Sequence, residues 1–253
     1  MTFFHARWPI FYEDNHLLVL YKPAGLIMQR GNAAKPNLVD LAKSWLKARY
    51  AKPGQVFVGM VHRLDAPVAG VLVLARTSKA AARLSAQFRE GRIAKTYLAV
   101  VQGRPPQDAA RLEHRLVRDG RLSRIAPEES SDGQTAALGY RLIGCEGAKS
   151  LLEVRLETGR RHQIRAQLAA GGCPIWGDRA YGAGQALADG RIALLAYKLA
   201  LTHPTRDIPL TFEAPLPQGW PWPSSQSEAD RPLWTIEEYY RQGLVLPVVF
   251  TLP

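Results

Sequence analysis

The chain has 253 residues, of which 47% are hydrophobic and 22% charged; this composition is typical of a folded protein and excludes disorder as the main state. No apolar run approaches the ~18 residues that a membrane-spanning helix needs, so we expect no membrane segment. Lysine and arginine outnumber aspartate and glutamate by 33 to 22, and the resulting net charge of +11 favours a polyanionic partner such as nucleic acid.

The remaining global features exclude several other classes. The first residues contain no basic segment followed by an apolar one, so no export signal is recognised and the expected compartment is the cytoplasm. The two cysteines, Cys145 and Cys173, form no CxxC pair and are expected to be small core residues. The histidines form no HExxH motif and lie near no cysteine cluster, so we predict no metal.

The first predicted elements are a hairpin and a helix. Residues 10–22 read as two strands separated by a turn at Asp14 and Asn15, and a second turn follows at residues 23–25. Asn37 is expected to cap a helix. Apolar residues recur at helical spacing after it, namely Leu38, Leu41, Ala42, Trp45 and Leu46.

A strand and a basic helix are predicted next. Residues 70–75 form a short, wholly apolar run that is typical of a buried strand. Ser78 is expected to cap a second helix that ends at Gly91 and has a basic polar face.

The second half of the chain adds two strands, at residues 93–101 and 151–157, and a short helix. In the later strand apolar and charged residues alternate, so one face is expected to be buried. The stretch RRHQIRAQLAAGG is typical of a helix with Arg160 and Arg161 at its N-terminal end, which favours anions. Strands and helices mix without regular alternation, so we predict an α+β fold with a mixed, largely antiparallel sheet.

The composition changes near Leu216, where proline and tryptophan become frequent. We therefore assign residues 1–217 to the main domain and residues 218–253 to a Pro/Trp-rich extension. Its tryptophans need a surface to cover, so we expect this extension to pack on the domain. We also expect it to be accessory, so that a chain ending at Gln218 keeps the chemistry of the main domain.

The sharpest local signal is VHRLDAPVAG at residues 61–70. A carboxylate beside an arginine, in a loop that enters a strand, is a common arrangement for functional side chains. On spacing alone, a surface Arg–Asp pair or a turn-capping aspartate remains an alternative for Asp65. A kinase is disfavoured because the Gly-rich loop and DFG are absent, and GAGQAL from residue 182 lacks the third glycine of a dinucleotide site.

Three further stretches follow HRLD in a characteristic order: KTYLAVVQG at residues 95–103, TGRRHQIR at 158–165 and GDRAYG at 177–182. Together they resemble the RluA-type pseudouridine synthases, enzymes that isomerise uridine in structured RNA. The resemblance covers about residues 10–217. It implies a pseudouridine-synthase-like fold with flanking helices and a central RNA-binding cleft, in a single catalytic domain, and we expect no S4-like domain.

The resemblance implies a catalytic set. Asp65 is the essential carboxylate, acting as a nucleophile or as a base on the sugar. Tyr97 lies against the uracil and helps to remove the C5 proton, and Arg165 keeps Asp65 ionised because an opposite charge favours the charged form. From the residues alone, a core tyrosine and a phosphate-binding arginine remain alternatives for Tyr97 and Arg165.

The same resemblance and the charge pattern imply a set of RNA contacts. Leu195 is expected to line the site beside the base, where relatives often have histidine. Val68 and Ala69 replace the usual Thr-Ser of the catalytic loop. The expected substrate-binding residues are His62, Arg63, Arg83, Arg89, Lys95, Arg160, Arg161, His162 and Leu195.

We therefore expect a cofactor-independent RNA pseudouridine synthase that acts on rRNA or tRNA, as a monomer with no obligate protein partner. One alternative is a catalytically inactive RNA-binding protein of the same fold. Another is a glycosidase-like hydrolase, which needs a second carboxylate across the scissile bond. Glu153, Glu157 and Asp178 are available, but no motif pairs any of them with Asp65.

Overall fold

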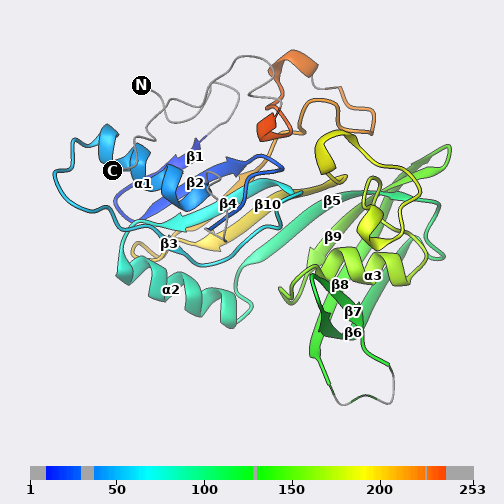
Figure 1. Ribbon diagram of the computed structural model, residues 1–253. Helices are drawn as coiled ribbons and strands as arrows, with labels where there is room; N and C mark the ends of the chain where they lie inside the picture. Colours follow the sequence, from blue (N-terminus) through cyan, green and yellow to red (C-terminus); the bar gives the residue numbers. More distant parts are fainter. Residues whose placement is uncertain (1–9, 30–36, 128–129, 131, 226, 238–253) are drawn as a thin grey trace.

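The structure is a computed structural model that describes residues 10–29, 37–127, 130, 132–225 and 227–237 (Figure 1). Its described strands form one eleven-stranded sheet in the order β1-β2-β4-β10-β5-β9-β8-β6-β7, with β3 beside β4 and β11 beside β10. Only β4 and β10 pair in parallel among these strands. The predicted α+β fold with a mixed, largely antiparallel sheet is confirmed.

The N-terminal half of the sheet is its most deeply buried part. Every residue of β2 and β4 is buried, as expected for strands that read as continuous apolar runs. Two helices pack beside these strands (Figure 1). The elements of this half are β1 (Ile10–Glu13), β2 (Leu17–Lys22), α1 (Leu38–Arg49), β3 (Gly59–Met60), β4 (Ala69–Ala75) and α2 (Ser78–Arg89).

The C-terminal half carries the third helix, α3, on β6 and β7. Strand β10 joins the two halves, and its later part pairs with β11. No described helix is long and apolar enough to cross a membrane. The elements of this half are β5 (Ala94–Gln102), β6 (Ala109–Asp119), β7 (Leu122–Ile125), β8 (Gln134–Glu146), β9 (Lys149–Leu156), α3 (Gln163–Ala170), η1 (Arg179–Tyr181), η2 (Ala188–Gly190), β10 (Leu194–Thr202), β11 (Pro209–Glu213) and η3 (Glu228–Asp230).

Side-chain caps explain where the first two helices begin. The Asn37 side chain accepts a hydrogen bond of 3.1 Å from the backbone N–H of Asp40, which confirms the predicted cap of α1. The cap of α2 is Thr77, whose hydroxyl accepts from the N–H of Ala80 at 3.2 Å. The prediction of Ser78 is therefore wrong by one residue, because the preceding threonine already has the extended backbone and the side-chain oxygen that a cap needs.

The two halves of the sheet meet along a very short parallel contact. Leu195 and Ala196 of β10 pair with Ala69 and Gly70 of β4. Gly70 has a φ of +128°, and a Cβ atom there would lie 2.2 Å from the carbonyl oxygen of Ala196. Only glycine permits this approach. Farther along, β4 pairs with β3 and β10 pairs with β11, so each strand takes a different partner.

The described part of the C-terminal extension contributes to the core. Its backbone pairs with Ala24, which donates to the carbonyl of Trp234 at 2.7 Å and accepts from the N–H of Ile236 at 3.1 Å. The expected packing on the domain is confirmed. That a chain ending at Gln218 keeps the chemistry of the main domain stays a prediction, and such a chain would leave the core residues under the extension uncovered. Residues 226 and 238–253 lie outside the described residues. The buried extension residues of the core are Trp220, Leu233, Trp234 and Ile236.

The two cysteines differ in environment. Cys173 is buried, as predicted, whereas Cys145 is exposed. The expectation for Cys145 is wrong because it lies near the end of β8, where the strand extends beyond the covered part of the sheet. Its Sγ atom lies 3.4 Å from Oγ of Ser150 on the neighbouring strand.

Asp14 fastens the first hairpin to the end of β10. Its Oδ1 atom accepts from the backbone N–H groups of His16 and Leu17 at 2.7 and 2.8 Å, and its Oδ2 atom lies 2.8 Å from Nε2 of His203. Since Nδ1 of His203 accepts from the N–H of Arg206 at 3.1 Å, Nε2 carries the hydrogen. Burial opposes the charged form of Asp14, but the hydrogen bonds outweigh it and hold its pKa well below the usual value.

We predict that Asp14→Asn lowers the free energy of unfolding by about 2–3 kcal/mol at pH 7, because charge-assisted hydrogen bonds are lost. The folded pKa of Asp14 lies below the unfolded one. The carboxylate's contribution is therefore complete above the unfolded pKa of about 4 and is lost as the pH falls through the folded value. Urea unfolding at pH 7, 5 and 3 should show the gap between variant and wild type shrinking at pH 3; a constant gap would contradict this.

Candidate active site

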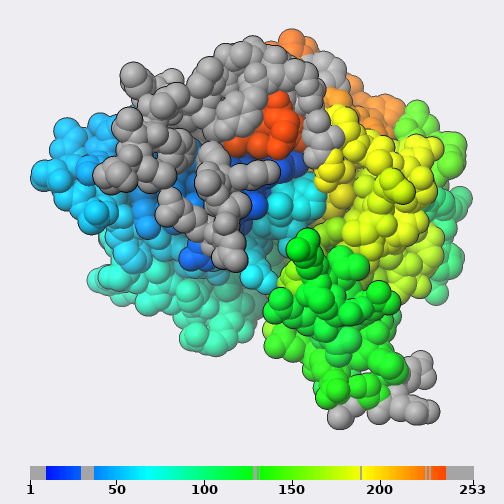
Figure 2. Space-filling view, in the orientation of Figure 1, coloured from blue at the N-terminus to red at the C-terminus, as the bar shows by residue number. Residues whose placement is uncertain are grey.

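A pocket of about 380 Å³ lies between the two halves of the sheet. In Figure 2 a notch opens between the green part of the molecule, β6 to β8, and the blue-green part that holds α2. Loop residues 61–68 and the end of α2 form one wall, and β5, the end of β9 and the first turn of α3 with the residues before it form the other. The predicted residues that line the pocket are His62, Arg63, Asp65, Arg89, Lys95, Tyr97, Arg160, His162 and Arg165.

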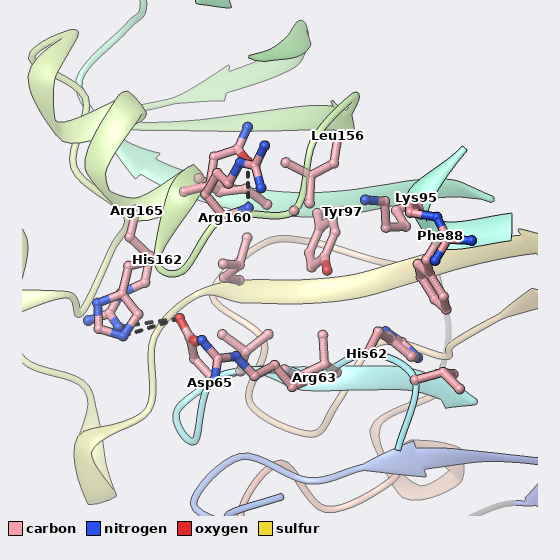
Figure 3. Close-up of a pocket in the computed structure, with 18 residues that line it drawn as sticks. His62, Arg63, Asp65, Phe88, Lys95, Tyr97, Leu156, Arg160, His162 and Arg165 are labelled. Carbon is pink, nitrogen blue, oxygen red and sulfur yellow. Dashed lines mark hydrogen bonds and ion pairs between the residues drawn. The ribbon is translucent and has the colours of Figure 1, made fainter. Parts of the chain in front are cut away.

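Asp65 faces two side chains from the opposite half of the sheet (Figure 3). Its Oδ2 atom lies 3.6 Å from Nη1 of Arg165 and 3.7 Å from Nε2 of His162, and the Asp65 side chain is 21% exposed. Both distances exceed a hydrogen bond, so neither neighbour occupies the carboxylate oxygen. Asp65 is the sole carboxylate among the described lining residues, which disfavours the two-carboxylate hydrolase.

A buried lysine supports the loop that carries Asp65. Nζ of Lys22 donates to the carbonyl oxygens of Leu26 at 2.9 Å and Ala66 at 3.2 Å, and the N–H of Gly25 donates to the same Ala66 oxygen at 2.7 Å. Burial lowers the pKa of Lys22 to about 7, against the opposing charge of Asp65. Lys22 is not among the residues expected from the sequence. The signal that could have identified it is the presence of a lysine at the end of a strand that is otherwise apolar.

Arg165 is held by a carboxylate on its far side. Its Nε and Nη2 atoms donate to Asp178 at 2.6 and 2.8 Å, and the side chains are 7% and 1% exposed. Burial works against the charged guanidinium, but the hydrogen bonds and charge of Asp178, with the charge of Asp65, raise the pKa of Arg165. Because Arg165 is buried and makes two hydrogen bonds to Asp178, it is poorly placed to bind a phosphate. This argues against the alternative that Arg165 is a phosphate-binding residue.

His162 joins the same group from the turn before α3. Its φ of +54° is left-handed, which is uncommon for a residue other than glycine. One ring nitrogen, Nε2, faces Asp65, and the other, Nδ1, lies 2.9 Å from the hydroxyl oxygen of Tyr181. Burial lowers the pKa of His162, and the charges of Arg165 and Arg161 act in the same direction, while Asp65 opposes them.

Tyr97 and Lys95 come from one face of β5, because alternate residues of a strand point to the same side. Figure 3 shows Tyr97 and Asp65 pointing into the pocket from opposite sides. Burial, and then the charge of Asp65, raise the pKa of Tyr97, so its phenol is protonated at neutral pH. Nζ of Lys95 lies 3.4 Å from the carbonyl oxygen of Thr158, and burial lowers the pKa of this lysine.

His62 has a structural partner within the sheet. Strand β3 ends at Met60, which pairs with Leu74 of β4. Beyond that point Nε2 of His62 accepts a hydrogen bond of 3.0 Å from the backbone N–H of Val73, the neighbouring residue of β4. The imidazole also stacks on Phe88 with 4.8 Å between ring centroids. Burial and the nearby charge of Lys95 lower the pKa of His62 to about 3, so the ring is neutral.

Three predicted substrate-binding residues lie outside the pocket lining. Leu195 is fully buried, and Leu194 lines the pocket instead, because successive strand residues face opposite sides. The prediction of Leu195 as lining is therefore wrong by one residue. Arg83 donates to the carbonyl of Pro204 at 2.7 Å. Arg161 donates to the carbonyl of Arg121; the RNA contacts of Arg83 and Arg161 stay predictions.

A second, shallow groove continues from the pocket along the β6–β7 hairpin. Its volume is about 280 Å³. Arg160 lines both the pocket and this groove, and Arg118 and Arg161 add two more cations. Within the described parts of the chain, no three His, Cys, Asp or Glu side chains cluster as a metal site would require.

Comparison with known proteins identifies close similarities. The RNA pseudouridylate synthase family matches residues 16–170. "Ribosomal large subunit pseudouridine synthase D" of Zymomonas mobilis is 35% identical over 220 residues, covering 83% of this chain and 69% of that protein. The protein of the same name in Xylella fastidiosa is 36% identical over 222 residues, covering 83% of this chain and 66% of that protein. The chain thus spans about two thirds of the length of these relatives.

A solved structure agrees with these matches. "Human RNA Pseudouridylate Synthase Domain Containing 4" superposes with a TM-score of 0.70 at 25% identity, over 83% of this chain and 89% of that one.

We predict that His62 does not titrate between pH 5 and 8. The pKa of about 3 keeps the ring neutral, and Nε2 needs its lone pair to accept the Val73 N–H. Nitrogen-15 NMR of the histidine rings should therefore show an unprotonated Nε2 across this range. A His62 resonance that moves with a midpoint near the usual 6.5 would contradict the assignment.

Proposed function

The chain belongs to the RNA pseudouridylate synthase family, and from this membership and its pocket we propose that it isomerises specific uridines of structured RNA to pseudouridine. One observation carries the proposal. Three motifs far apart in the sequence bring Asp65, Tyr97 and Arg165 to a single pocket. An RNA-binding protein that had lost its chemistry would have no need to keep all three groups together.

The reaction breaks the N1–C1′ bond of uridine, forms a C5–C1′ bond, and exchanges the C5 proton for a proton on N1. It is redox-neutral, so the proposed chemistry requires no cofactor. We assign the bond-breaking step to Asp65, as a nucleophile at C1′ or as a base on the sugar. Both roles require a carboxylate whose oxygen is accessible, and the nearest atom of the Arg165 guanidinium, Nη1, lies 3.6 Å from Oδ2 of Asp65.

We assign Tyr97 to the uracil face. Its ring points into the pocket opposite Asp65, where a flipped base would lie between them (Figure 3). Because burial raises its pKa, the hydroxyl keeps its proton at neutral pH and can donate to a polar atom of the base. Direct removal of the C5 proton by Tyr97 would first require loss of that phenol proton, which the same burial disfavours.

The proposed RNA path follows the basic residues around the pocket. Arg63 and Arg89 are exposed at its rim, and Arg160 leads into the groove of the β6–β7 hairpin. These cations can bind phosphates on both sides of an extruded nucleotide. The names of the relatives make large-subunit ribosomal RNA the first substrate to test, with tRNA as the second.

We further propose that the protein acts in the cytoplasm as a monomer and without an obligate protein partner. The support is that every residue of the proposed catalytic set comes from one chain.

We predict that Asp65→Asn lowers the rate of pseudouridine formation at least about 1,000-fold, because the variant keeps the shape but loses the charge required for bond breaking. RNA affinity should be unchanged or slightly higher, since one repulsive charge is removed. Tritium release from C5-labelled uridine measures turnover, and binding is measured in parallel at the same salt concentration.

Asp108→Asn is the matched control for this experiment. It removes the same charge from an exposed aspartate that pairs with Arg104, outside the pocket. It should turn over at the wild-type rate. An Asp65→Asn variant as active as Asp108→Asn, or a wild-type protein inactive on every cellular RNA, would refute the proposed function.

We predict that the double variant Arg63→Gln and Arg89→Gln weakens RNA binding and flattens its salt dependence. Each lost phosphate contact should reduce the slope of log affinity against log salt by about 0.7–0.9. The folded structure should persist because both side chains are exposed. Arg104→Gln, in the loop that follows β5, is the control; equal slopes for the double variant and Arg104→Gln would place the RNA elsewhere.

A further inference from the structure

The segment around η1 supplies two side chains, Asp178 and Tyr181, that lie behind the pocket. Neither residue is part of the pocket lining. Each contacts one of the two groups that face Asp65: Asp178 bonds Arg165, and Tyr181 bonds His162. They are therefore placed to orient catalytic groups without touching the substrate.

Asp178 determines where Arg165 points. A guanidinium is planar and its nitrogens are fixed relative to one another. Once Nε and Nη2 are bonded to the two oxygens of Asp178, the third nitrogen, Nη1, has one direction left, and it faces Asp65 at 3.6 Å. The side chain of Asp178 is 1% exposed, so water cannot replace it as the acceptor.

Tyr181 determines which nitrogen of His162 carries the hydrogen. The Tyr181 hydroxyl oxygen accepts the N–H of Ser123 at 2.9 Å. It also lies 3.0 Å from the carbonyl oxygen of Ser123 and 2.9 Å from Nδ1 of His162. The single hydroxyl hydrogen can serve only one of these two acceptors at a time.

The two choices have opposite consequences at Asp65. If the Tyr181 hydroxyl donates to Nδ1, a neutral His162 carries its hydrogen on Nε2 and presents a positive edge to the carboxylate. If the hydroxyl donates to Ser123, Nδ1 must donate, and a neutral ring directs a lone pair at Asp65 from 3.7 Å. The second arrangement turns a lone pair toward a carboxylate, whereas the first gives up only the hydrogen bond between two neutral groups, the Tyr181 hydroxyl and the Ser123 carbonyl at 3.0 Å. Because an interaction with a charged group is the stronger one, the first arrangement is favoured. Burial keeps the ring neutral by lowering the pKa of His162.

A third contact links the two pairs, Asp178 with Arg165 and Tyr181 with His162; these pairs are the two arms of the arrangement. The Tyr181 ring lies 4.7 Å from the guanidinium carbon of Arg165, a distance at which a cation and an aromatic face attract. Replacing Tyr181 with phenylalanine therefore keeps this packing and removes only the hydroxyl. The arrangement allows the two arms to be tested separately.

We propose that Asp178 and Tyr181 are positioning residues for pseudouridine formation: Asp178 directs Arg165 Nη1 toward Asp65, and Tyr181 holds His162 with its hydrogen on Nε2. This inference rests on the proposed function. It assigns His162 to the support of Asp65 in place of the RNA contact expected from the sequence.

Single-turnover rates on saturating RNA, with RNA affinity and stability measured on the same samples, test the proposal. Asp178→Asn should slow the chemical step by about 10–100-fold, as is typical when a residue supporting a catalytic group is altered. Tyr181→Phe should slow it by about 5-fold, the equivalent of one hydrogen bond. RNA affinity should stay within about 2-fold of wild type for both variants, because neither side chain lines the pocket.

Two matched variants control for structural damage. Tyr197→Phe removes a hydroxyl that bonds Glu213 at 3.1 Å outside the pocket, and Asp14→Asn removes a carboxylate that bonds His203. Asp14→Asn should lose stability yet keep the wild-type single-turnover rate when folded. If Asp178→Asn and Tyr181→Phe behave like these controls, the proposal is overturned even where Asp65→Asn is inactive.

Nitrogen-15 NMR of His162 gives a readout that is independent of turnover. In the wild-type protein Nε2 should be protonated and Nδ1 unprotonated, and Tyr181→Phe should shift this balance, whereas Tyr197→Phe should not. A wild-type His162 protonated on Nδ1 alone would overturn the Tyr181 arm. A protein that shows the expected His162 signal but makes no pseudouridine would instead refute the proposed function.

Discussion

The close approach of β4 and β10 at Gly70 is the constraint on which the site depends. A side chain at Gly70 would collide with the Ala196 carbonyl, so glycine is what lets the two halves of the sheet join there. The loop that carries Asp65 enters β4 just before this contact, and Tyr97 pairs with Ala196 from the other edge of β10. This one backbone contact therefore places Asp65 and Tyr97 on the same pocket.

Electrostatics organises the groups around this contact. Asp65 and Asp178 lie on two sides of Arg165, but the guanidinium contacts them unequally. It donates two hydrogen bonds to Asp178, whereas its nearest approach to Asp65 is 3.6 Å, too long for a hydrogen bond. A buried arginine needs such a partner, because an isolated charge would be costly to desolvate. The tight pair satisfies that need and leaves the Asp65 oxygen open to a substrate atom.

The basic composition and the pocket serve different parts of the same task. Exposed arginines at the rim and along the β6–β7 groove supply attraction for phosphates that does not depend on base identity. Among its described lining residues the pocket contains a single carboxylate, Asp65, which a base turned out of its stack would meet beside Tyr97. The described part of the C-terminal extension supports the Asp65 loop from behind. Its Trp234 is buried and its backbone pairs with Ala24, next to the Gly25 N–H that bonds the Ala66 carbonyl of that loop.

The elements that could be predicted from the sequence are those whose pattern is local: apolar β2 and β4, the Asn37 cap, and the motifs that contain Asp65, Tyr97 and Arg165. The sequence did not reveal β6 to β8, because most of their residues are exposed or half-buried and the apolar signal is weak. It also misplaced Leu195 by one residue and did not select Lys22 or Tyr181. The bond between Asp178 and Arg165, and the hydrogen bond that His62 accepts from Val73, were not predictable in this way. Hydrogen bonds between distant segments depend on side-chain direction in the folded chain, which residue spacing does not specify.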